Sequence, residues 1–424
     1  MPRRFRVLMS AFACEPYKGS EPEVGWQWAV QMARFHDLTV ITQSKNRPSI
    51  ERAAAELSHR QPVPRFVYFD RNPFPQSLRQ LGAGLRLYYI LWHKAARHLV
   101  SDLHHAEPFD LMHHVTFAGF RYSTAIWGHG IPTIWGPIGG IESSPLRLLP
   151  WSHLPALVAE MGRNLHNAIQ RSRFNILPKR LEATTVTLAS TLDMQQLFER
   201  LGFKVPLMAT IGLRTADLPF QERGLAQGPL KLLFVGKIIA LKGLHLAIDA
   251  LAASGTDATL AVIGEGPLQG AMERRAKRLG LGQRLSFRGR QPREEVLKAY
   301  SQFEVLVFPS LHDTGGYAVI EAMCQGVPLI CLDRGGPAIA VRDGGGIKVP
   351  IGSRRTVVAR LAAANQAYDR DRQLLLEHGR KARQTILRDY DWDKKGEQLA
   401  RIYDEAVAHG QPLASGLSRT AESS

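Results

Sequence analysis

Two lysines follow a short apolar run in the second half of the chain. The run 233–237, Leu-Phe-Val-Gly-Lys, ends in Gly236 and Lys237, and Lys242 follows five residues later, just before Gly243. In an open α/β sheet, ligands bind beyond the carboxyl ends of the strands. A glycine there lets a phosphate approach the backbone, and the N-terminus of the next helix favours an anion. Lys237 and Lys242 could therefore neutralise a diphosphate. The alternative is two solvated lysines on an ordinary strand–helix loop.

A second polar group joins another apolar run to a helix. Asp313 lies eight positions before Glu321, with Gly315 and Gly316 between them. If the helix begins near Gly316, Glu321 lies about one and a half turns inside it, whereas Asp313 stays in the loop. A carboxylate there can accept hydrogen bonds from two vicinal ribose hydroxyls, and glycine N–H groups can meet sugar or phosphate oxygens. The alternative is a capping role for Asp313 at an acidic helix start.

This second group resembles the acidic motif of retaining glycosyltransferase family 4. Asp313, seven intervening residues, Glu321, Ala-Met and Gly-x-Pro follow in the family's order. Other parts of the chain that are similar to family motifs are 236–237 with 242–243, 263–267 and 287–289. The resemblance covers essentially the whole chain. The family's first acid is usually glutamate, so the shorter Asp313 leaves the identity of the transferred sugar open.

The resemblance implies a role for each matching residue. Donor binding is implied for Gly19, Ser20, Gly236, Lys237, Lys242, Gly289, Arg290, Gly315, Gly316, Tyr317 and Glu321. Catalytic roles are implied for Lys237, Lys242, Asp313 and the pair His113 and His114. The resemblance also implies that the lysines take the place of a metal. No metal and no cofactor are therefore expected, and a nucleotide-diphosphate sugar serves as co-substrate.

The first half of the chain also contains motifs that are similar to those of the family. Gly19-Ser20 follows the first strand, where the family places a Gly-Gly pair near the donor phosphates. Asp110-Leu-Met-His113-His114 ends a strand and is similar to the family's Asp-x-x-His motif. Strand alternation sends the two histidines to opposite faces, so we expect only one to enter the site. The alternative for either is a core residue. The glycine-rich run 135–140 is either an acceptor-side loop or backbone architecture.

Short apolar runs alternate with helical patterns over most of the chain, which is typical of α/β layers with mostly parallel sheets. We expect strands at 6–10, 38–42, 66–69, 111–115, 133–135, 185–188, 230–235, 258–263, 284–288, 305–308 and 328–331. The resemblance implies a GT-B fold, in which two Rossmann-like domains face each other across a cleft and a C-terminal helix crosses back to the first domain. The expected division is an acceptor-binding domain at 1–217, a linker at 218–229, a nucleotide-sugar-binding domain at 230–392, a crossover helix at 393–410 and a disordered tail at 411–424.

The length, net charge and composition of the chain indicate its number of domains, its partners and its compartment. A chain of 424 residues is long enough for two domains. The net charge of +16 divides into +9 before residue 220 and +7 after it, so no basic tail carries the excess. Such diffuse charge suits an anionic donor and an anionic membrane surface, and no nucleic-acid motif accompanies it. Three cysteines, no signal peptide and no apolar stretch of membrane-spanning length favour the cytoplasm.

One segment bears on contact with the inner face of the membrane. Residues 79–97 interleave basic and aromatic side chains at helical spacing. We favour a core helix with a solvated basic edge, and the alternative is a helix lying on an anionic bilayer.

The triplet Asp389, Asp391 and Asp393 resembles a metal-binding Asp-x-Asp motif, but it lies after the second domain. We interpret this triplet as a helix start.

The function expected from these features is retaining, metal-independent transfer of a sugar to a saccharide or lipid-linked acceptor, in cell-surface polysaccharide synthesis. Within the same fold, a sugar-nucleotide epimerase or a disaccharide phosphorylase is an alternative. A dinucleotide-dependent oxidoreductase is disfavoured because no Gly-x-Gly-x-x-Gly follows the first strand. A nucleic-acid-binding protein has only the net charge in its favour.

Overall fold

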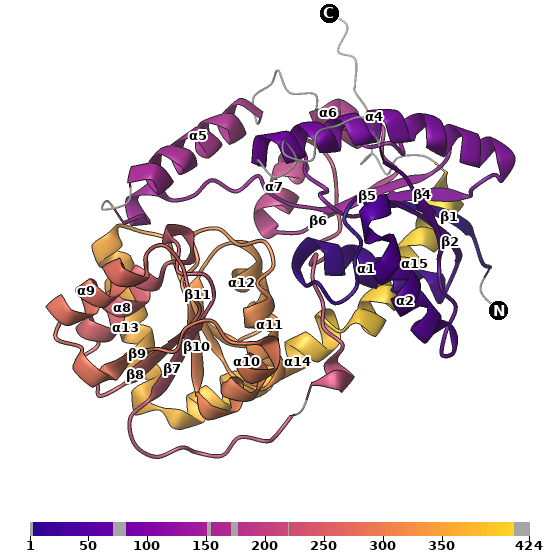
Figure 1. The fold of residues 1–424 in the computed structure, drawn as a ribbon. Helices are drawn as coiled ribbons and strands as arrows, with labels where there is room; N and C mark the ends of the chain where they lie inside the picture. Colours follow the sequence, from indigo (N-terminus) through magenta and orange to yellow (C-terminus); the bar gives the residue numbers. More distant parts are fainter. Residues whose placement is uncertain (1–2, 71–81, 151–153, 171–176, 219, 411–424) are drawn as a thin grey trace, which may run out of the picture. The chain divides into compact units, whose positions relative to one another are not determined.

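The computed structural model describes residues 3–70, 82–150, 154–170, 177–218 and 220–410 (Figure 1). Contacts group the chain into two compact units. The first unit contains Met1–Ile141, Ser172–Thr210 and Lys395–Ser424, and the second contains Glu142–Arg171 and Ile211–Lys394. No helix in these described ranges combines the length and apolarity needed to cross a bilayer.

The first unit is built on a six-stranded parallel sheet in the order β3-β2-β1-β4-β5-β6. Its strands are β1 Arg6–Ser10, β2 Asp37–Thr42, β3 Arg65–Tyr68, β4 Leu111–His114, β5 Thr133–Ile138 and β6 Val186–Ala189. Its helices are α1 Ser20–Ala33, α2 Arg47–Ser58, α4 Gly82–Ala106, α6 Leu177–Glu182 and α7 Leu192–Arg200. Most strand residues are buried, as expected for a parallel sheet covered on both faces.

Helix α4 packs its aromatic residues into the core of the first unit. Tyr88, Tyr89 and Trp92 are buried and belong to one cluster with Phe12 of the β1 loop. The Trp92 indole N–H donates to the Phe69 carbonyl at 2.8 Å. The expected core helix is therefore present, and its basic residues Arg86, Lys94 and Arg97 are exposed. Residues 79–81 of the predicted segment lie outside the described residues.

The second unit is also built on a six-stranded parallel sheet, with strand order β12-β11-β10-β7-β8-β9. Its strands are β7 Lys231–Val235, β8 Thr259–Ile263, β9 Leu285–Phe287, β10 Val305–Phe308, β11 Leu329–Leu332 and β12 Gly346–Val349. Its helices are α5 Leu154–Gln170, α8 Leu244–Ala253, α9 Gln269–Arg278, α10 Arg293–Ala299, α11 Tyr317–Cys324, α12 Gly335–Ala340, α13 Arg354–Arg370 and α14 Arg372–Asp389. Helix α15, Trp392–His409, begins in this unit and continues from Lys395 in the first.

Each sheet has one point at which the chain changes its direction of winding. In the first sheet the chain adds strands on one side of β1, from β2 to β3, and then adds β4, β5 and β6 on the other side of β1. In the second sheet the chain adds β8 and β9 on one side of β7, and then adds β10, β11 and β12 on the other side of β7. Ligands of open α/β sheets bind outside the carboxyl ends of the two strands at such a switch point. The loops after β1, β4, β7 and β10 are therefore the places at which to examine the predicted residues.

The α/β prediction is confirmed, because every strand that the apolar runs predict is present. The short edge strand β12 was not predicted. Tyr403 of α15 contacts β4 of the first unit, as expected for a last helix that returns to the first half. The expected domain bounds stay predictions; residues 142–171 pack with the second unit, and the predicted disordered tail at 411–424 lies outside the described residues.

Candidate functional site

The predicted lysines lie just after β7, at the switch point of the second sheet. Lys237 is exposed, whereas the Lys242 side chain is 24% exposed and forms an ion pair with Asp313. The Lys242 ammonium also lies 5.1 Å from the centroid of the Phe308 ring. Because Asp313 follows β10, this ion pair joins the two strands that define the switch point. Lys242 is thus held in place rather than solvated on an ordinary loop.

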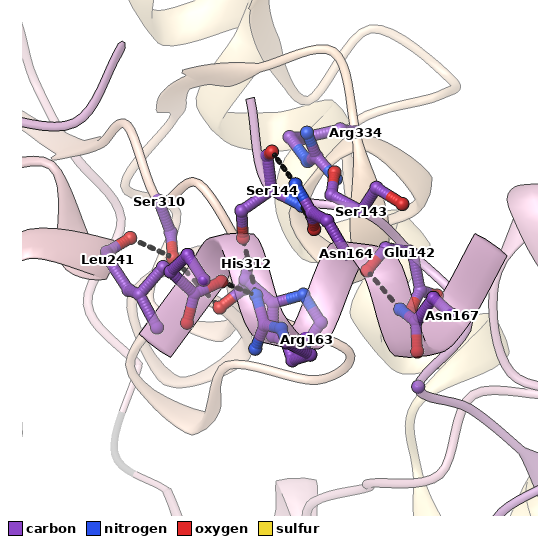
Figure 2. Close-up of polar contacts among 12 residues, drawn as sticks. Glu142, Ser143, Ser144, Arg163, Asn164, Asn167, Leu241, Ser310, His312 and Arg334 are labelled. Atoms are coloured by element: carbon purple, nitrogen blue, oxygen red, sulfur yellow. Dashed lines mark hydrogen bonds and ion pairs between the residues drawn. The ribbon is translucent and has the colours of Figure 1, made fainter. Parts of the chain in front are cut away.

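Backbone contacts fix the two loops that carry this pair. The Leu311 N–H donates to the Leu241 carbonyl at 2.7 Å, and the Ser310 hydroxyl donates to the same oxygen at 3.2 Å (Figure 2). Gly243 has φ +73°, and a Cβ on it would lie 2.0 Å from the Pro309 carbonyl oxygen. Only glycine allows this close approach. The juxtaposition of Lys242 and Asp313 therefore follows from the backbone path.

The loop that carries Asp313 is closed by its own hydrogen bonds. The Asp313 carboxylate accepts from the Gly315 N–H at 3.3 Å, and its carbonyl accepts from Gly336 at the start of α12 at 2.9 Å. Helix α11 begins at Tyr317 with Gly316, at φ 84°, as its N-cap, without a side-chain capping bond. The predicted placement of Asp313 in the loop is confirmed. Its carboxylate orders the loop and does not cap the helix.

Glu321 lies inside α11, as predicted, and is 5% exposed. Its carboxylate accepts a hydrogen bond from Arg293 Nε at 2.9 Å and contacts the Tyr300 hydroxyl at 3.5 Å. Burial raises the pKa of Glu321, and the Arg293 charge opposes this shift. Arg293 is the first residue of α10. We did not predict it as a site residue, since a single arginine at a helix start carries no distinguishing pattern.

The remaining residues of the second unit that were predicted to bind the donor lie along the same edge of the sheet. The Gly236 N–H donates to the Ile263 carbonyl at 3.0 Å, and the Gly289 carbonyl accepts from Gly264 at 2.8 Å. A Cβ on Gly264 would lie 1.9 Å from the Gly236 carbonyl oxygen, so the loops after β7 and β8 meet backbone to backbone. Arg290 is mostly exposed, 3.7 Å from Glu265. The structure thus brings the predicted donor residues of this unit to one edge.

The loops at the switch point of the first unit hold an unusual backbone. Gly19 has φ 69°, and the non-glycine residues with positive φ in the described ranges are Tyr17, Ser20 and Phe117. Tyr17 and Gly19 lie in the loop after β1, Ser20 begins α1 directly after that loop, and Phe117 lies in the loop after β4. The Glu21 carboxylate, in the first turn of α1, accepts from the Phe117 N–H at 2.6 Å and so ties the start of α1 to the loop after β4. Strained backbone of this kind concentrates at functional sites.

His113 and His114 point to different partners, as strand alternation predicts. His113 Nε2 donates to the Gly136 carbonyl at 2.9 Å, so Nδ1 accepts from the Tyr403 hydroxyl at 2.7 Å. His114 contacts the Tyr89 hydroxyl at 3.0 Å. Both rings are buried, and burial lowers the pKa of His113 to about 4 and that of His114 to about 3. This geometry suits core residues; a reacting role for one of the pair stays a prediction.

Asp391 and Asp393 of the aspartate triplet lie at the start of α15, as predicted, whereas Asp389 is the last residue of α14. The Asp391 carboxylate accepts from the Asp393 N–H at 2.9 Å and from the Lys394 N–H at 3.3 Å, so it caps α15. Asp389 instead pairs with Arg342 at 2.8 Å. Across the described residues, no group of three or more His, Cys, Asp and Glu side chains is placed to hold a metal ion.

The glycine-rich run 135–140 was predicted to form an acceptor-side loop, and that role stays a prediction.

Residues 217–380 match the family model described as glycosyl transferases group 1. Glycogen synthase of Mycobacterium tuberculosis is 30% identical over 195 residues, which are 45% of this chain and 46% of that protein. A 2-deoxystreptamine glucosyltransferase of Streptomyces kanamyceticus is 37% identical over 106 residues, 24% of this chain and 27% of that protein. The chain therefore aligns with about half of these relatives' length or less. The matched segment contains the switch point of the second sheet.

Solved structures match nearly the whole chain in fold. Sucrose-phosphate synthase from Thermosynechococcus elongatus has a TM-score of 0.63 at 16% identity, covering 96% of this chain and 100% of that one. Anabaena HepE in complex with UDP and glucose has a TM-score of 0.58 at 16% identity, covering 95% and 100%. At such low identity the likeness concerns the fold. The GT-B fold expected from the sequence is confirmed.

Proposed function

We propose that this protein is a hexosyltransferase that moves a sugar from a nucleotide-diphosphate sugar to a saccharide or lipid-linked acceptor. The observation that carries the proposal is the ion pair between Lys242 and Asp313 at the switch point of the second sheet. It lies within the segment that matches group 1 glycosyl transferases. A structural neighbour, HepE, has been solved with UDP-glucose, which supports a donor of this class. No cofactor beyond the donor and no nucleic-acid partner belong to this proposal.

The chemistry follows from the charge that develops on the leaving group. When the sugar departs, negative charge grows on the β-phosphate, and fixed cations there stabilise the transition state. Lys242 supplies such a cation, Lys237 is the exposed second one, and α8 begins directly after Gly243. A bound diphosphate competes with Asp313 for Lys242. The Asp313 carboxylate is then released toward the sugar hydroxyls, and Glu321 accepts from the ribose.

The proposed reaction retains the anomeric configuration and needs no metal. The acceptor attacks from the face that the diphosphate leaves, and the leaving phosphate takes the acceptor proton. No separate carboxylate nucleophile is required on this route. The lysines perform the charge stabilisation that a divalent cation performs in metal-dependent transferases.

The proposed acceptor belongs to cell-surface polysaccharide synthesis. One relative is a putative colanic acid biosynthesis glycosyltransferase of Salmonella typhimurium, 27% identical over 184 residues. We place the protein in the cytoplasm, in peripheral contact with the anionic inner face of the membrane. The net charge of +16 supports that contact.

Replacing Lys242 tests the proposal. Lys242→Ala should lower kcat/KM for sugar transfer by roughly 2 kcal/mol, the lower end of the range for losing one partner of a charge pair, because this pair is only partly buried. The measurement is release of nucleoside diphosphate from a panel of nucleotide sugars, in buffer that contains EDTA. Lys277→Ala, an exposed lysine in the last turn of α9, is the matched control and should keep full activity.

Two results would contradict this account. Turnover of Lys242→Ala close to that of the unchanged protein would remove the assigned role of the lysine. Activity that disappears in EDTA and returns with manganese would overturn the metal-free route. A requirement for inorganic phosphate in place of a nucleotide sugar would instead indicate a disaccharide phosphorylase.

A further inference from the structure

The second unit contains a basic pocket beside β9, the strand at one edge of its sheet (Figure 1). Its volume is 330 Å³, at the lower end of the range of about 300–1,000 Å³ for small-molecule pockets. None of the residues predicted to bind the donor lines it. Of the described residues that line it, three are basic and none is acidic. We call it the β9 pocket, and its main lining residues are Lys231, Thr259, Arg284, Ser286, Arg288 and Phe303.

Strand alternation places this pocket on one face of the sheet. Leu232 of β7 and Leu260 of β8 belong to the apolar core that includes residues of α8, α9 and α13. Lys231 and Thr259, one position earlier on each strand, pair with each other and point to the opposite face. Both are the first residues of their strands. The pocket therefore reaches the amino ends of β7 and β8, whereas the loops with Lys237 and Lys242 follow the carboxyl end of β7.

Arg284 is held at this pocket by neutral partners. Its Nε donates to the Ala258 carbonyl at 3.2 Å, and Nη2 donates to the Leu251 carbonyl at 3.0 Å. Two carbonyls orient the guanidinium, but they carry no net charge that could neutralise it. The protein thus fixes the position of this cation and leaves its charge available to a ligand.

Arg288 and Lys231 are also cations without a carboxylate partner. The Arg288 guanidinium lies over the ring of Phe303, with Cζ 4.9 Å from the ring centroid, and this ring is buried. The Lys231 side chain is exposed. Within the described part of the chain, neither of these side chains nor Arg284 forms an ion pair with a carboxylate. Three cations at one pocket therefore favour an anionic ligand.

The acidic residue next to the pocket is already neutralised. Glu304 follows Phe303 and is buried; its Oε1 accepts from Arg372 at 2.6 Å, and its Oε2 accepts from the Lys231 backbone N–H at 3.0 Å. A larger cavity of 610 Å³ adjoins the β9 pocket at Lys231 and Phe303. That cavity is lined by Glu304 and Glu222 as well as by basic residues, so its charges largely balance. The uncompensated positive charge lies in the β9 pocket.

The side chains of the β9 pocket indicate the class of anion. Arginine and lysine together suit a phosphate group, which accepts several charge-assisted hydrogen bonds. The only aromatic ring among the described lining residues, Phe303, is already covered by Arg288, so a nucleotide base finds no free ring on which to stack. Hydroxyl and amide side chains can instead donate to and accept from sugar hydroxyls. These side chains are Thr259, Ser286, Gln283 and Gln302.

We propose that the β9 pocket is a second ligand site, which binds a phosphorylated sugar. Lys231, Arg284 and Arg288 bind the phosphate, and the hydroxyl and amide side chains of the pocket bind the sugar hydroxyls. This site goes beyond the proposed donor site, because it uses none of the residues assigned to the nucleotide sugar. Its occupation requires no transfer reaction and can be measured whether or not the protein turns over a donor.

The test is isothermal titration calorimetry of the full chain with glucose 1-phosphate. Lys231→Gln and Arg288→Gln should each weaken binding about tenfold, because each removes one charged contact to the phosphate. Glucose and inorganic phosphate, titrated separately, should each bind at least about tenfold more weakly than glucose 1-phosphate. The matched control is Lys277→Gln, because Lys277 is an exposed lysine of α9, whose buried residues pack against the opposite face of the sheet. This control should bind as the unchanged protein does.

Four outcomes would overturn the proposal. They are no binding of glucose 1-phosphate by the unchanged protein, unchanged binding by both Lys231→Gln and Arg288→Gln, and inorganic phosphate binding as tightly as glucose 1-phosphate. The fourth is binding that Lys242→Ala abolishes while Lys231→Gln retains it, which would place the phosphate at the donor loop. Urea denaturation of the two pocket variants confirms that a loss of binding is not a loss of folding. Lys231 is exposed, so its replacement should leave stability unchanged.

Discussion

Glu321 is a buried carboxylate whose charge depends on one partly exposed arginine. The Arg293 side chain is 64% exposed, and its charge lowers a pKa that burial of Glu321 raises. Arg293→Ala should therefore raise the pKa of Glu321 further. The acid limb of nucleotide binding should then move to higher pH. Because solvent screens Arg293, we expect a loss of about 1 kcal/mol, roughly fivefold in affinity for UDP or GDP at neutral pH.

Titration calorimetry across pH 5 to 8 measures this effect. The matched control is Lys298→Ala on the same helix, since Lys298 pairs at the surface with Glu295 and is not near Glu321. It should leave both the affinity and its pH profile unchanged. An Arg293→Ala protein with an unshifted acid limb would show that the charge of Glu321 does not control nucleotide binding.

Single residues were predictable where their types form a pattern. Asp313, Glu321 and Lys242 could be predicted because their spacing resembles a motif, but the ion pair between Lys242 and Asp313 could not. It depends on β7 and β10 being neighbours, and a sequence separation of 71 residues does not show that. Arg293 likewise reaches Glu321 only through the packing of α10 near α11.

At the scale of elements, the start of α8 depends on one glycine. Gly243 combines φ +73° with a position at which a Cβ would lie 2.0 Å from the Pro309 carbonyl oxygen. Gly243→Ala should therefore destabilise the second unit by on the order of 3 kcal/mol or more, since backbone strain and a clash with backbone add together. Urea denaturation followed by circular dichroism measures the change.

The end of the same helix supplies the control for Gly243. Gly255 also has a positive φ, +62°, but a Cβ on it would meet nothing within 4 Å. Gly255→Ala should cost only about 1 kcal/mol, the strain of a left-handed conformation. Equal losses for the two variants would show that the approach to Pro309 contributes nothing.

Elements were predictable to different extents for physical reasons. Buried strands such as β7 are runs of apolar residues and were recognisable, whereas β12 is four residues at a sheet edge with little apolar character. The spacing in α5 shows an amphipathic helix but does not say which side faces outward. That orientation is decided by partners of Asn164 and Asn167 some twenty or more residues away in sequence. Tertiary packing, not local pattern, sets it.

Across the whole molecule, buried histidines are kept neutral. Burial lowers the pKa of His113 to about 4, of His114 to about 3 and of His245 to about 4, and it also lowers that of His93. In the unfolded chain these rings titrate near pH 6.5. Between that pH and about 4 the unfolded chain therefore binds more protons than the folded protein, so stability falls as the pH falls. Glu21 and Glu321, whose pKa values burial raises, act in the opposite direction and offset part of the effect.

The free energy of unfolding should accordingly be highest above pH 6.5 and decline steadily toward pH 4. A shift from 6.5 to about 4 for His113 alone corresponds to on the order of 3 kcal/mol. For units of this size that lowers the Tm by roughly 10 °C. Scanning calorimetry at half-unit steps of pH measures the decline, and His113→Asn, which cannot take up a proton, should make it shallower than exposed His59→Asn does. A decline that is no shallower for His113→Asn than for His59→Asn would show that the His113 ring is protonated in the folded protein, against the burial that the structure assigns to it.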